Sequence, residues 1–340
     1  MPHNDRTEQM PQTRFDVLAI GNAIVDVISP CDDAFVAAHG LDKGAMALID
    51  AAEAEALYSA MGPGREISGG SAANTLAGLA GLGARCAFIG KVADDQLGDV
   101  FAHDIRAAGI HYAVDPLIGA VPTARCLVHV TPDGQRTMNT FLGASQDLDA
   151  GSVDKQLIKD AAIVYLEGYL WDPEAARTAM QEAIVTAREA GRKVAFTLSD
   201  VFLLQRFGQD FKAMIEDGAI SILFANEGEA LTLTGAADLD AAIAQLAPML
   251  PCLVVTRGAR GAVAVTGGER FEVPAEPVEK VVDTTGAGDS FAAGFLAGQI
   301  AGRPPRDCLT MGAIAAAEII SHYGARPEAD LEALMARRFG

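Results

Sequence analysis

The chain has 340 residues, of which 50% are apolar and 21% are charged, so it can build a substantial core and is not a disordered protein. Its 26 Lys and Arg against 45 Asp and Glu give a net charge of −19, which argues against nucleic acid or an anionic lipid surface as the main ligand. No apolar run reaches the roughly 18 residues that cross a bilayer. Five widely separated cysteines favour reduced thiols. We therefore expect a cytoplasmic protein with neither a membrane nor a nucleic-acid partner.

The rest of the pattern predicts a doubly wound α/β domain. The polar segment 1–14 has no apolar stretch and is expected to be a loose tail before a domain over 15–340. Apolar runs of strand length alternate with helical stretches, as in a mostly parallel sheet covered by helices on both faces. Strands are predicted at 15–20, 85–90, 162–166, 193–198, 220–224, 252–256 and 262–266. Helices are predicted at 71–82, 173–190, 239–247, 289–301 and 307–321.

Two stretches break this alternation. Residues 45–49 read as a short strand, and 124–131 with 135–141 read as a hairpin around Pro132-Asp133-Gly134. No helix is predicted there, so we expect a small β lid, formed by about 27–50 and 111–142, over one edge of the domain. The sequence has no internal repeat, and no Pro-rich linker separates the lid segments from the rest, which favours a single domain that carries the lid as an insertion.

The segment Asp283-Thr-Thr-Gly-Ala-Gly-Asp289 carries the strongest chemical signal. It follows a strand-like run at 278–282 and opens an Ala-rich helix. Gly286 and Gly288 permit backbone conformations closed to other residues, and the free N–H groups of a helix start bind anions. Asp289 is either a helix cap or a base that accepts a hydroxyl proton while the amides hold a transferring phosphoryl group. The residues themselves leave both readings open.

A second glycine segment, Ser68-Gly69-Gly70-Ser71-Ala-Ala-Asn74, enters another predicted helix. It is either an ordinary tight turn or a place where backbone approaches a ligand and Asn74 offers an amide to a polyol. Asn22 and Asp26 follow the first strand, at the carboxyl edge where open α/β sheets bind ligands. An amide and an acid suit vicinal hydroxyls, so together these residues predict a polyol site.

Two weaker patterns point to a nucleotide. Asn226-Glu-Gly-Glu229 follows a predicted strand, and its oxygen-bearing side chains suit a water-bound Mg²⁺ near phosphates. Acidic residues also commonly begin helices, so this pattern alone is weak. Thr256-Arg-Gly258-Ala-Arg-Gly261 lies between two predicted strands, as either a nucleotide loop or an ordinary hairpin turn.

Several familiar motifs are absent from the sequence. It has no G-x-x-x-x-G-K-[ST] loop and no dinucleotide fingerprint after the first strand. The two near matches to G-x-S-x-G, around Ser71 and Ser290, lack the final glycine. The six histidines have no ligand spacing. These absences argue against a hydrolase or a metalloenzyme.

Taken together, the segments resemble the ribokinase-like (PfkB) family of small-molecule kinases from about 16 to 327. The segment ending at Asp289 resembles the C-terminal signature of the family, Gly69 to Asn74 the N-terminal one, and Asn226 to Glu229 its N-x-x-E motif. Within the family the strongest likeness is to adenosine kinases, whose G-N-P-L-L-D opening resembles Gly21 to Asp26. The resemblance implies a ribokinase-like α/β fold and a Mg-ATP-dependent phosphotransferase.

The resemblance also implies roles for single residues. Asp289 would be the catalytic base, and the amides of Gly286, Ala287 and Gly288 would form the anion hole. Arg136, on the lid, would steady phosphate charge. The ribose hydroxyls would be held by Asn22, Asp26, Gly69, Gly70, Ser71 and Asn74. ATP would be bordered by Asn226, Thr256, Gly258 and Gly261. Asn226 and Glu229 would hold Mg²⁺ through water, and Asp283 and Thr285 would offer backbone carbonyls to a monovalent cation such as K⁺.

Two departures concern the acceptor. Thr285 stands where adenosine kinases commonly have Asn, and Gly168-Tyr169-Leu170-Trp171 differs from their Phe-rich segment, although Tyr169 can still stack on a base. The sequence favours phosphorylation of the primary (5′) hydroxyl of a nucleoside, adenosine first, with a ribokinase- or fructokinase-like sugar kinase as the alternative. A non-catalytic nucleoside sensor is a further alternative, against which the retained Asp289 argues. The expected assembly is a monomer or a homodimer through the lid.

Overall fold

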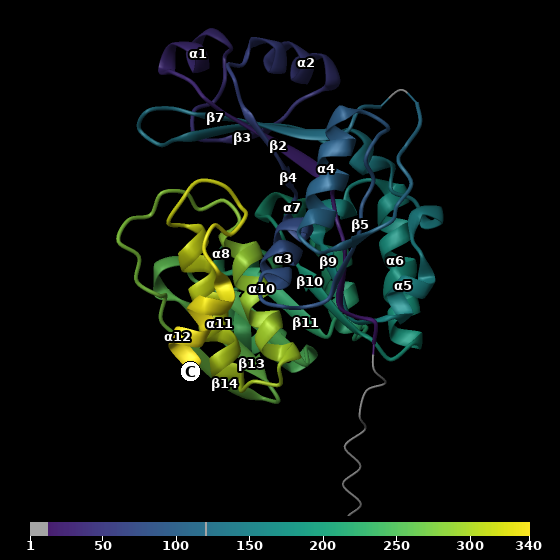
Figure 1. Ribbon diagram of the computed structural model, residues 1–340. Helices are drawn as coiled ribbons and strands as arrows, with labels where there is room; N and C mark the ends of the chain where they lie inside the picture. Colours follow the sequence, from purple (N-terminus) through teal and green to yellow (C-terminus); the bar gives the residue numbers. More distant parts are fainter. Residues whose placement is uncertain (1–12, 120) are drawn as a thin grey trace, which may run out of the picture.

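The computed structural model describes residues 13–119 and 121–340, so the expected tail at 1–14 lies outside the described residues apart from its last two. Two sheets organise the chain: a nine-stranded sheet in the main body and a five-stranded sheet above it (Figure 1). The first sheet has the order β14-β13-β12-β11-β10-β9-β1-β5-β6. Its strands are β1 (Phe15–Ile20), β5 (Cys86–Ile89), β6 (His111–Tyr112), β9 (Ala161–Glu167), β10 (Lys193–Thr197), β11 (Ile222–Asn226), β12 (Cys252–Thr256), β13 (Ala262–Thr266) and β14 (Glu269–Val273).

The large sheet reverses its order beside β1. Strand β1 pairs in parallel with β5 on one side and with β9 on the other, while only β13 and β14 run antiparallel to their neighbours. The predicted doubly wound α/β fold is therefore confirmed. In such sheets, ligands bind outside the carboxyl ends of the strands where the order reverses, which here means the ends of β1 and β9.

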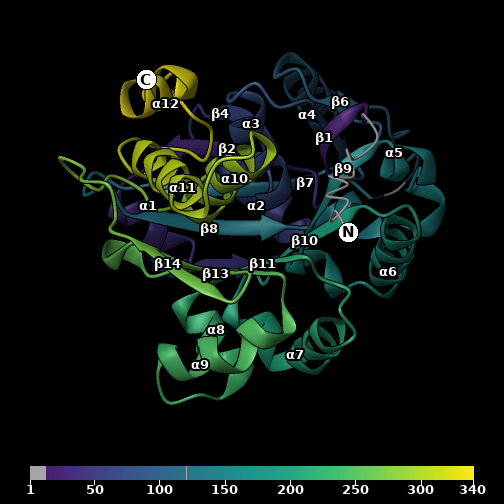
Figure 2. The same cartoon turned by 90° about the horizontal axis from the view of Figure 1, so that it is seen from below.

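Helices cover both faces of this sheet because its strands are apolar on both sides. Figure 2 shows α7, α8 and α9 on one face and α3, α10 and α11 on the other, and each set packs into its own apolar core. The helices of the main body are α3 (Ser71–Ala80), α4 (Gln96–Ala107), α5 (Lys155–Lys159), α6 (Glu174–Glu189), α7 (Val201–Glu216), α8 (Glu227–Thr234), α9 (Leu239–Leu246), α10 (Ala287–Ile300), α11 (Pro305–Ile319) and α12 (Leu331–Phe339).

The second sheet is the lid, with the order β3-β8-β7-β2-β4. Its strands are β2 (Ile24–Pro30), β3 (Met46–Leu48), β4 (Arg65–Gly69), β7 (Ala124–Val130) and β8 (Arg136–Phe141). The expected hairpin is present as β7 and β8. The lid is larger than expected, because β4 belongs to it, whereas β6, inside the expected range 111–142, pairs in the large sheet.

The expectation that the lid lacks helices is wrong. It carries α1 (Asp33–Ala38) and α2 (Ala51–Ala60), which lie above the sheet in Figure 1. Helix α2 buries only Ala54 and Leu57, so its apolar spacing is weak in the sequence. The helix is instead marked by a capping box between Asp50 and Glu53, a signal that does not depend on an apolar face.

The expected strand at 278–282 is also absent from the structure. Val281 is 52% exposed, and the N–H of Val282 donates to the carbonyl of Ile320 (2.8 Å) rather than to a neighbouring strand. The segment therefore runs as an irregular stretch before α10. Helices α4, α7 and α12 are not among the predicted helices, and they begin at the side-chain caps Asp95, Asp200 and Asp330.

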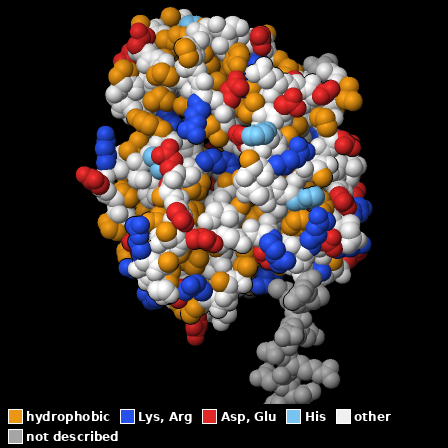
Figure 3. All heavy atoms as spheres, viewed as in Figure 1, with side chains coloured by type: hydrophobic (Ala, Val, Ile, Leu, Met, Phe, Trp, Pro, Cys, Tyr) orange, Lys and Arg blue, Asp and Glu red, His pale blue; other side chains and the backbone are white. Residues whose placement is uncertain are grey.

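The described surface carries both signs of charge. Figure 3 shows Lys and Arg side chains interspersed with Asp and Glu over one face, so the negative excess is not gathered there. Within 13–119 and 121–340, none of the helices combines the length and the apolar character that a membrane crossing needs.

Glycines bring α10 against its neighbours at backbone distance. A Cβ placed on Gly294 would lie 2.4 Å from the carbonyl oxygen of Met311 on α11, and one on Gly298 would lie 2.9 Å from the Cα of Cys308. On the other side, a Cβ on Gly78 of α3 would lie 2.7 Å from the Cβ of Ala293. Helix α10 is therefore fixed between α3 and α11 with no room for side chains.

We predict that Gly294→Ala destabilises the fold. The added methyl meets backbone that cannot move alone, and overpacking of this kind costs about 1–3 kcal/mol in the free energy of unfolding. Gly208→Ala, inside α7, is the matched control: its nearest contact is 4.0 Å away, and alanine favours a helix over glycine by about 1 kcal/mol. Urea unfolding of both variants measures the difference, and equal midpoints would contradict the close packing of α10.

Candidate active site

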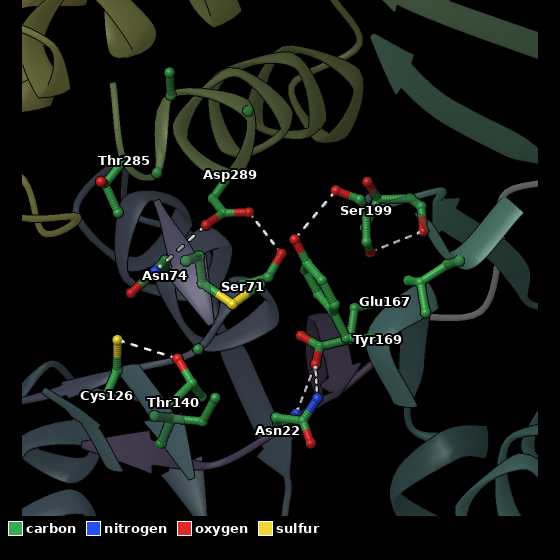
Figure 4. Close-up of a pocket in the computed structure, with 18 of the residues that line it drawn as sticks. Asn22, Ser71, Asn74, Cys126, Thr140, Glu167, Tyr169, Ser199, Thr285 and Asp289 are labelled. Carbon is green, nitrogen blue, oxygen red and sulfur yellow. Dashed lines mark hydrogen bonds between the residues drawn. The ribbon is translucent and has the colours of Figure 1, made fainter. Parts of the chain in front are cut away.

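A cavity of about 520 Å³ lies where the sheet order suggests, between the carboxyl ends of β1 and β9 and the underside of the lid. Lid strands contribute Cys126 and Thr140, and the start of α10 contributes Asp289. Figure 4 shows these side chains converging from opposite sides of the cavity. The cavity therefore combines lid, sheet and helix start, as an enclosed reaction site requires.

Asp289 lies in the first turn of α10 but does not cap it. Its Oδ1 accepts a hydrogen bond from Ser71 Oγ (2.6 Å) and its Oδ2 accepts one from Asn74 Nδ2 (3.3 Å), both on α3 (Figure 4). Gly286 is the N-cap of α10, which has no side-chain cap. Burial raises the pKa of Asp289 to about 6, against the opposing effect of these two hydrogen bonds. The cap reading of Asp289 is therefore wrong, and the carboxylate is mostly ionised at pH 7.

The loop before α10 turns at a residue that must be glycine. Gly286 has a φ of +75°, and a Cβ there would lie 2.7 Å from that of Ala325. The loop is braced by the carboxylate of Asp283, which accepts hydrogen bonds from the N–H (3.0 Å) and hydroxyl (2.8 Å) of Thr285 and from the N–H of Gly324 (3.1 Å). Thr285, Gly286, Ala287 and Gly288 line the cavity.

Arg136 differs from its expected place. Its Nη1 lies 2.8 Å from Asp283 Oδ2 in an ion pair whose side chains are only 7% and 5% exposed, and it does not line the cavity. The guanidinium turns away because Asp283 offers it a carboxylate inside the protein. Arg136 therefore ties lid strand β8 to the loop before α10. A role at phosphate stays a prediction, as does a monovalent cation at the carbonyls of Asp283 and Thr285.

A fully buried carboxylate, Glu167 at the end of β9, was missed by the sequence reasoning. Its Oε1 accepts from the N–H (2.8 Å) and the Nδ2 (2.7 Å) of Asn22, and its Oε2 accepts from the N–H of Ala72 (2.7 Å). Burial raises the pKa of Glu167 to about 7. Gly21 must be glycine, since a Cβ there would lie 2.6 Å from Oε2. Asn22 thus lines the cavity with its amide nitrogen already engaged.

The remaining predicted polyol residues lie beside this carboxylate. Asp26, on β2, lines the cavity, and burial raises its pKa to about 6. Gly69 lets it approach, since a Cβ at Gly69 would lie 2.5 Å from Asp26 Oδ2. Gly70 has a φ of +97°, and a Cβ there would lie 2.2 Å from the carbonyl oxygen of Asn22. The two glycines therefore let the β4–α3 turn close over the end of β1.

Tyr169 and Phe202 give the cavity an aromatic wall. Tyr169 lies in the 3₁₀ turn Gly168–Trp171, its ring is tilted against that of Phe202 (6.4 Å between centroids), and its hydroxyl donates to the carbonyl of Ser199 (3.3 Å). Ser199 has a φ of +70°, which is rare for a residue with a side chain. Its hydroxyl oxygen accepts from the N–H of Gly168 (2.9 Å), so the turn that presents Tyr169 is held from behind.

Asn226 and Glu229 form a capping box at the start of α8. Asn226 accepts from the N–H of Glu229 (2.8 Å), and Glu229 accepts from the N–H (2.9 Å) and Nδ2 (2.7 Å) of Asn226. Burial raises the pKa of Glu229 to about 7. Among the described residues no three His, Cys, Asp or Glu side chains gather as metal ligands. A Mg²⁺ held by Asn226 and Glu229 through water stays a prediction.

A second cavity, of about 540 Å³, adjoins the first. It contains the expected nucleotide residues Thr256, Gly258 and Gly261, and the last two belong to the turn between the antiparallel strands β12 and β13. That segment is therefore a hairpin turn that also lines a cavity. Both cavities share Thr256, Thr284, Ala287, Gly288 and Phe291. The glycine loop thus forms the boundary between two sites, the arrangement needed for transfer from a donor to an acceptor.

Residues 44–331 match the family described as pfkB family carbohydrate kinase. The chain belongs to this family. The chain is 32% identical over 244 residues to a fructokinase of Klebsiella pneumoniae, covering 70% of this chain and 79% of that protein. Among solved structures, it is 49% identical to the adenosine kinase from Sinorhizobium meliloti (TM-score 0.88) and 47% identical to a probable sugar kinase from Rhizobium etli CFN 42 (TM-score 0.89). Each match covers 96% of this chain and 99% of the other.

The resemblance read from the sequence is therefore confirmed. As a member of the family, the chain is a nucleoside or sugar kinase, a phosphotransferase with an alcohol group as acceptor and ATP as donor. Similar proteins carry both adenosine kinase and sugar kinase names, so membership alone does not choose the acceptor.

We predict that Glu167 makes stability depend on pH. The folded protein keeps its proton up to about pH 7, whereas the unfolded chain releases it near 4.5, so the free energy of unfolding falls as pH rises between these values. At 1.36 kcal/mol per unit, the fall is about 3 kcal/mol. Glu167→Gln should flatten this slope, measured by urea unfolding from pH 5 to 8, while Gln at the exposed Glu174 should not. A slope unchanged by Glu167→Gln would contradict the raised pKa.

Proposed function

We propose that this chain transfers the γ-phosphoryl group of Mg-ATP to the primary (5′) hydroxyl of a nucleoside, with adenosine as the preferred acceptor. The observation that carries the proposal is the position of Asp289. Its carboxylate does not cap its own helix, has a pKa of about 6, and lies in the acceptor cavity beside the glycine loop shared with the second cavity. A base near neutrality in that position suits a hydroxyl nucleophile.

In the proposed reaction, the acceptor hydroxyl gives its proton to Asp289 as its oxygen bonds to the γ-phosphorus, and the bond to the β-phosphate oxygen breaks to release ADP. Ser71 and Asn74 hold the carboxylate from α3, so it points at the acceptor without rearrangement. The amides of Gly286, Ala287 and Gly288 stabilise the charge on the transferring group. The lid closes the cavity from above and excludes water that would compete with the acceptor.

Mg²⁺, when bound, neutralises phosphate charge. We propose that Asn226 and Glu229 hold it through water. The position of both side chains supports this proposal, because Asn226 and Glu229 line the same cavity as Asp289.

The choice of a nucleoside rests on the lining of the acceptor cavity. Its polar side chains, such as Asp26 and Asn74, suit ribose hydroxyls in a nucleoside or a free sugar alike. The same cavity is also lined by Tyr169, Phe202 and Leu142, an apolar surface that a free sugar does not need. An aromatic wall next to a sugar site favours a base that can stack, so the geometry supports a nucleoside over ribose or fructose.

We predict that Asp289→Asn abolishes transfer and leaves acceptor binding nearly intact. Asparagine can still accept the hydrogen bond from Ser71 but cannot take a proton. Loss of a general base lowers the rate by about 10²–10⁴-fold. Steady-state ADP release and calorimetric acceptor affinity measure the two effects. Asp307→Asn, which changes a first-turn acid on the neighbouring helix α11, should keep the wild-type rate. If Asp289→Asn kept half of the activity, Asp289 would not be the base.

We predict that Tyr169→Ala weakens adenosine but barely changes ribose affinity. Stacking of a base on an aromatic ring contributes roughly 1–3 kcal/mol, or about 5–150-fold in affinity. Tyr169→Phe keeps the ring and loses only the hydroxyl that donates to Ser199, so it should bind adenosine nearly as the wild type does. Calorimetry with both ligands on each variant makes the comparison. Equal losses for adenosine and ribose would show that Tyr169 only packs the cavity wall.

A further inference from the structure

Arg326 lies in the loop between α11 and α12, outside both glycine motifs and outside both cavities. Each of the three nitrogens of its guanidinium donates a hydrogen bond. Nε donates to the carbonyl of Ser68 (2.9 Å), Nη2 donates to the hydroxyl of Ser68 (3.1 Å), and Nη1 donates to the carbonyl of Ala73 (2.8 Å). One guanidinium thus binds both the end of lid strand β4 and the first turn of α3.

The turn between these two contacts is the one that carries the partners of Asp289. It runs through Gly69, Gly70 and Ser71, and Asn74 follows in the first turn of α3. The turn has a positive φ at Gly70 and no side-chain cap at the start of α3, so it has little local support of its own. Arg326 therefore adds, from a distant part of the chain, contacts on both sides of this turn to the one that Glu167 makes with Ala72.

Arg326 also brings a positive charge to a group of acids. It lowers the pKa of both Asp26 and Asp289, and these two carboxylates and Asp104 in turn favour its charged form. Burial lowers the pKa of Arg326 to about 10, so it stays protonated at neutral pH. The titratable or charged groups that act on Asp289 or are acted on by it come from β2, β9, the turn after β9 and this loop: Asp26, Tyr165, Glu167, Tyr169 and Arg326.

We infer that Arg326 is a positioning residue for phosphoryl transfer, which clamps the β4–α3 turn behind Asp289 and whose positive charge favours the ionised form of that carboxylate. It touches neither cavity and acts through Ser71, Asn74 and the carboxylate itself. The inference rests on the proposed role of Asp289 as the base. It adds to that role a residue in a loop that no glycine motif marks.

Two substitutions separate the clamp from the charge. Arg326→Gln removes the charge, so the acid limb of the kcat/KM profile should move to higher pH, and the rate at pH 6 should fall by a larger factor than the rate at pH 8.5. Arg326→Lys keeps the charge, but an ammonium cannot replace the planar fork. Its acid limb should stay in place while kcat falls at least about tenfold at every pH, because the partners of Asp289 are misplaced.

The profiles are measured from pH 5.5 to 9 with Mg-ATP and whichever of adenosine, inosine, ribose or fructose the wild type phosphorylates fastest. Arg306→Gln is the matched control, since Arg306 also donates to a backbone carbonyl (3.2 Å) but on the exposed side of α11. It should keep the wild-type profile. Urea midpoints of all variants show whether the fold is intact.

An acid limb unmoved in Arg326→Gln would overturn the inference, because a purely structural arginine changes stability without moving the limb. If Arg326→Gln does not fold, Arg326→Lys decides: a wild-type kcat would overturn the clamp, and a tenfold loss with an intact midpoint would support it. The proposed base fails separately. An active Asp289→Asn variant would refute the role of Asp289, whereas an inactive one beside an unmoved limb would refute only the role of Arg326.

Discussion

The buried carboxylate of Glu167 joins the three segments on which the acceptor cavity depends. It lies at the end of β9 and accepts hydrogen bonds from Asn22 after β1 and from Ala72 at the start of α3. Leaving such a group without partners would cost several kcal/mol, so these segments are held together wherever the fold is intact. The reversal of strand order brings β1 and β9 together, and the hydrogen bonds of Glu167 fix the ends of these strands and the start of α3 as one wall of the cavity.

A second constraint fixes Asp289 beside Ser71 and Asn74 on that wall. Helix α10 is pressed between α3 and α11 through Gly78, Gly294 and Gly298, so its first turn cannot drift from the first turn of α3. Asp289 therefore meets Ser71 and Asn74 by backbone packing rather than by loop flexibility. The buried pair of Arg136 and Asp283 then fastens the lid to the loop before α10. The cavity, Asp289 and the lid are thus parts of one packed unit, which suits the proposed transfer because it must exclude water.

What the sequence reveals follows from how local each signal is. The alternation of strands and helices predicts the α/β fold, and the glycines before Asp289 and Ser71 mark both site turns, because these features lie within a few residues. Glu167 and Arg326 cannot be identified in this way. Glu167 lies 95 residues from its partner Ala72, and Arg326 lies 258 residues from its partner Ser68, so no local spacing encodes either pair. The capping box of Asn226 and Glu229 is local, yet the same residue types suit a cation, so the sequence alone cannot separate the two uses.

The central claim is that the aromatic wall of the acceptor cavity selects a nucleoside. Initial rates of ADP release with Mg-ATP and adenosine, inosine, ribose or fructose test it most directly, together with phosphorus NMR of the product to place the new ester. The account predicts that adenosine has the highest kcat/KM and that the phosphate is on the 5′ oxygen. A higher kcat/KM for ribose or fructose than for adenosine, or a phosphate on any other oxygen, would contradict it.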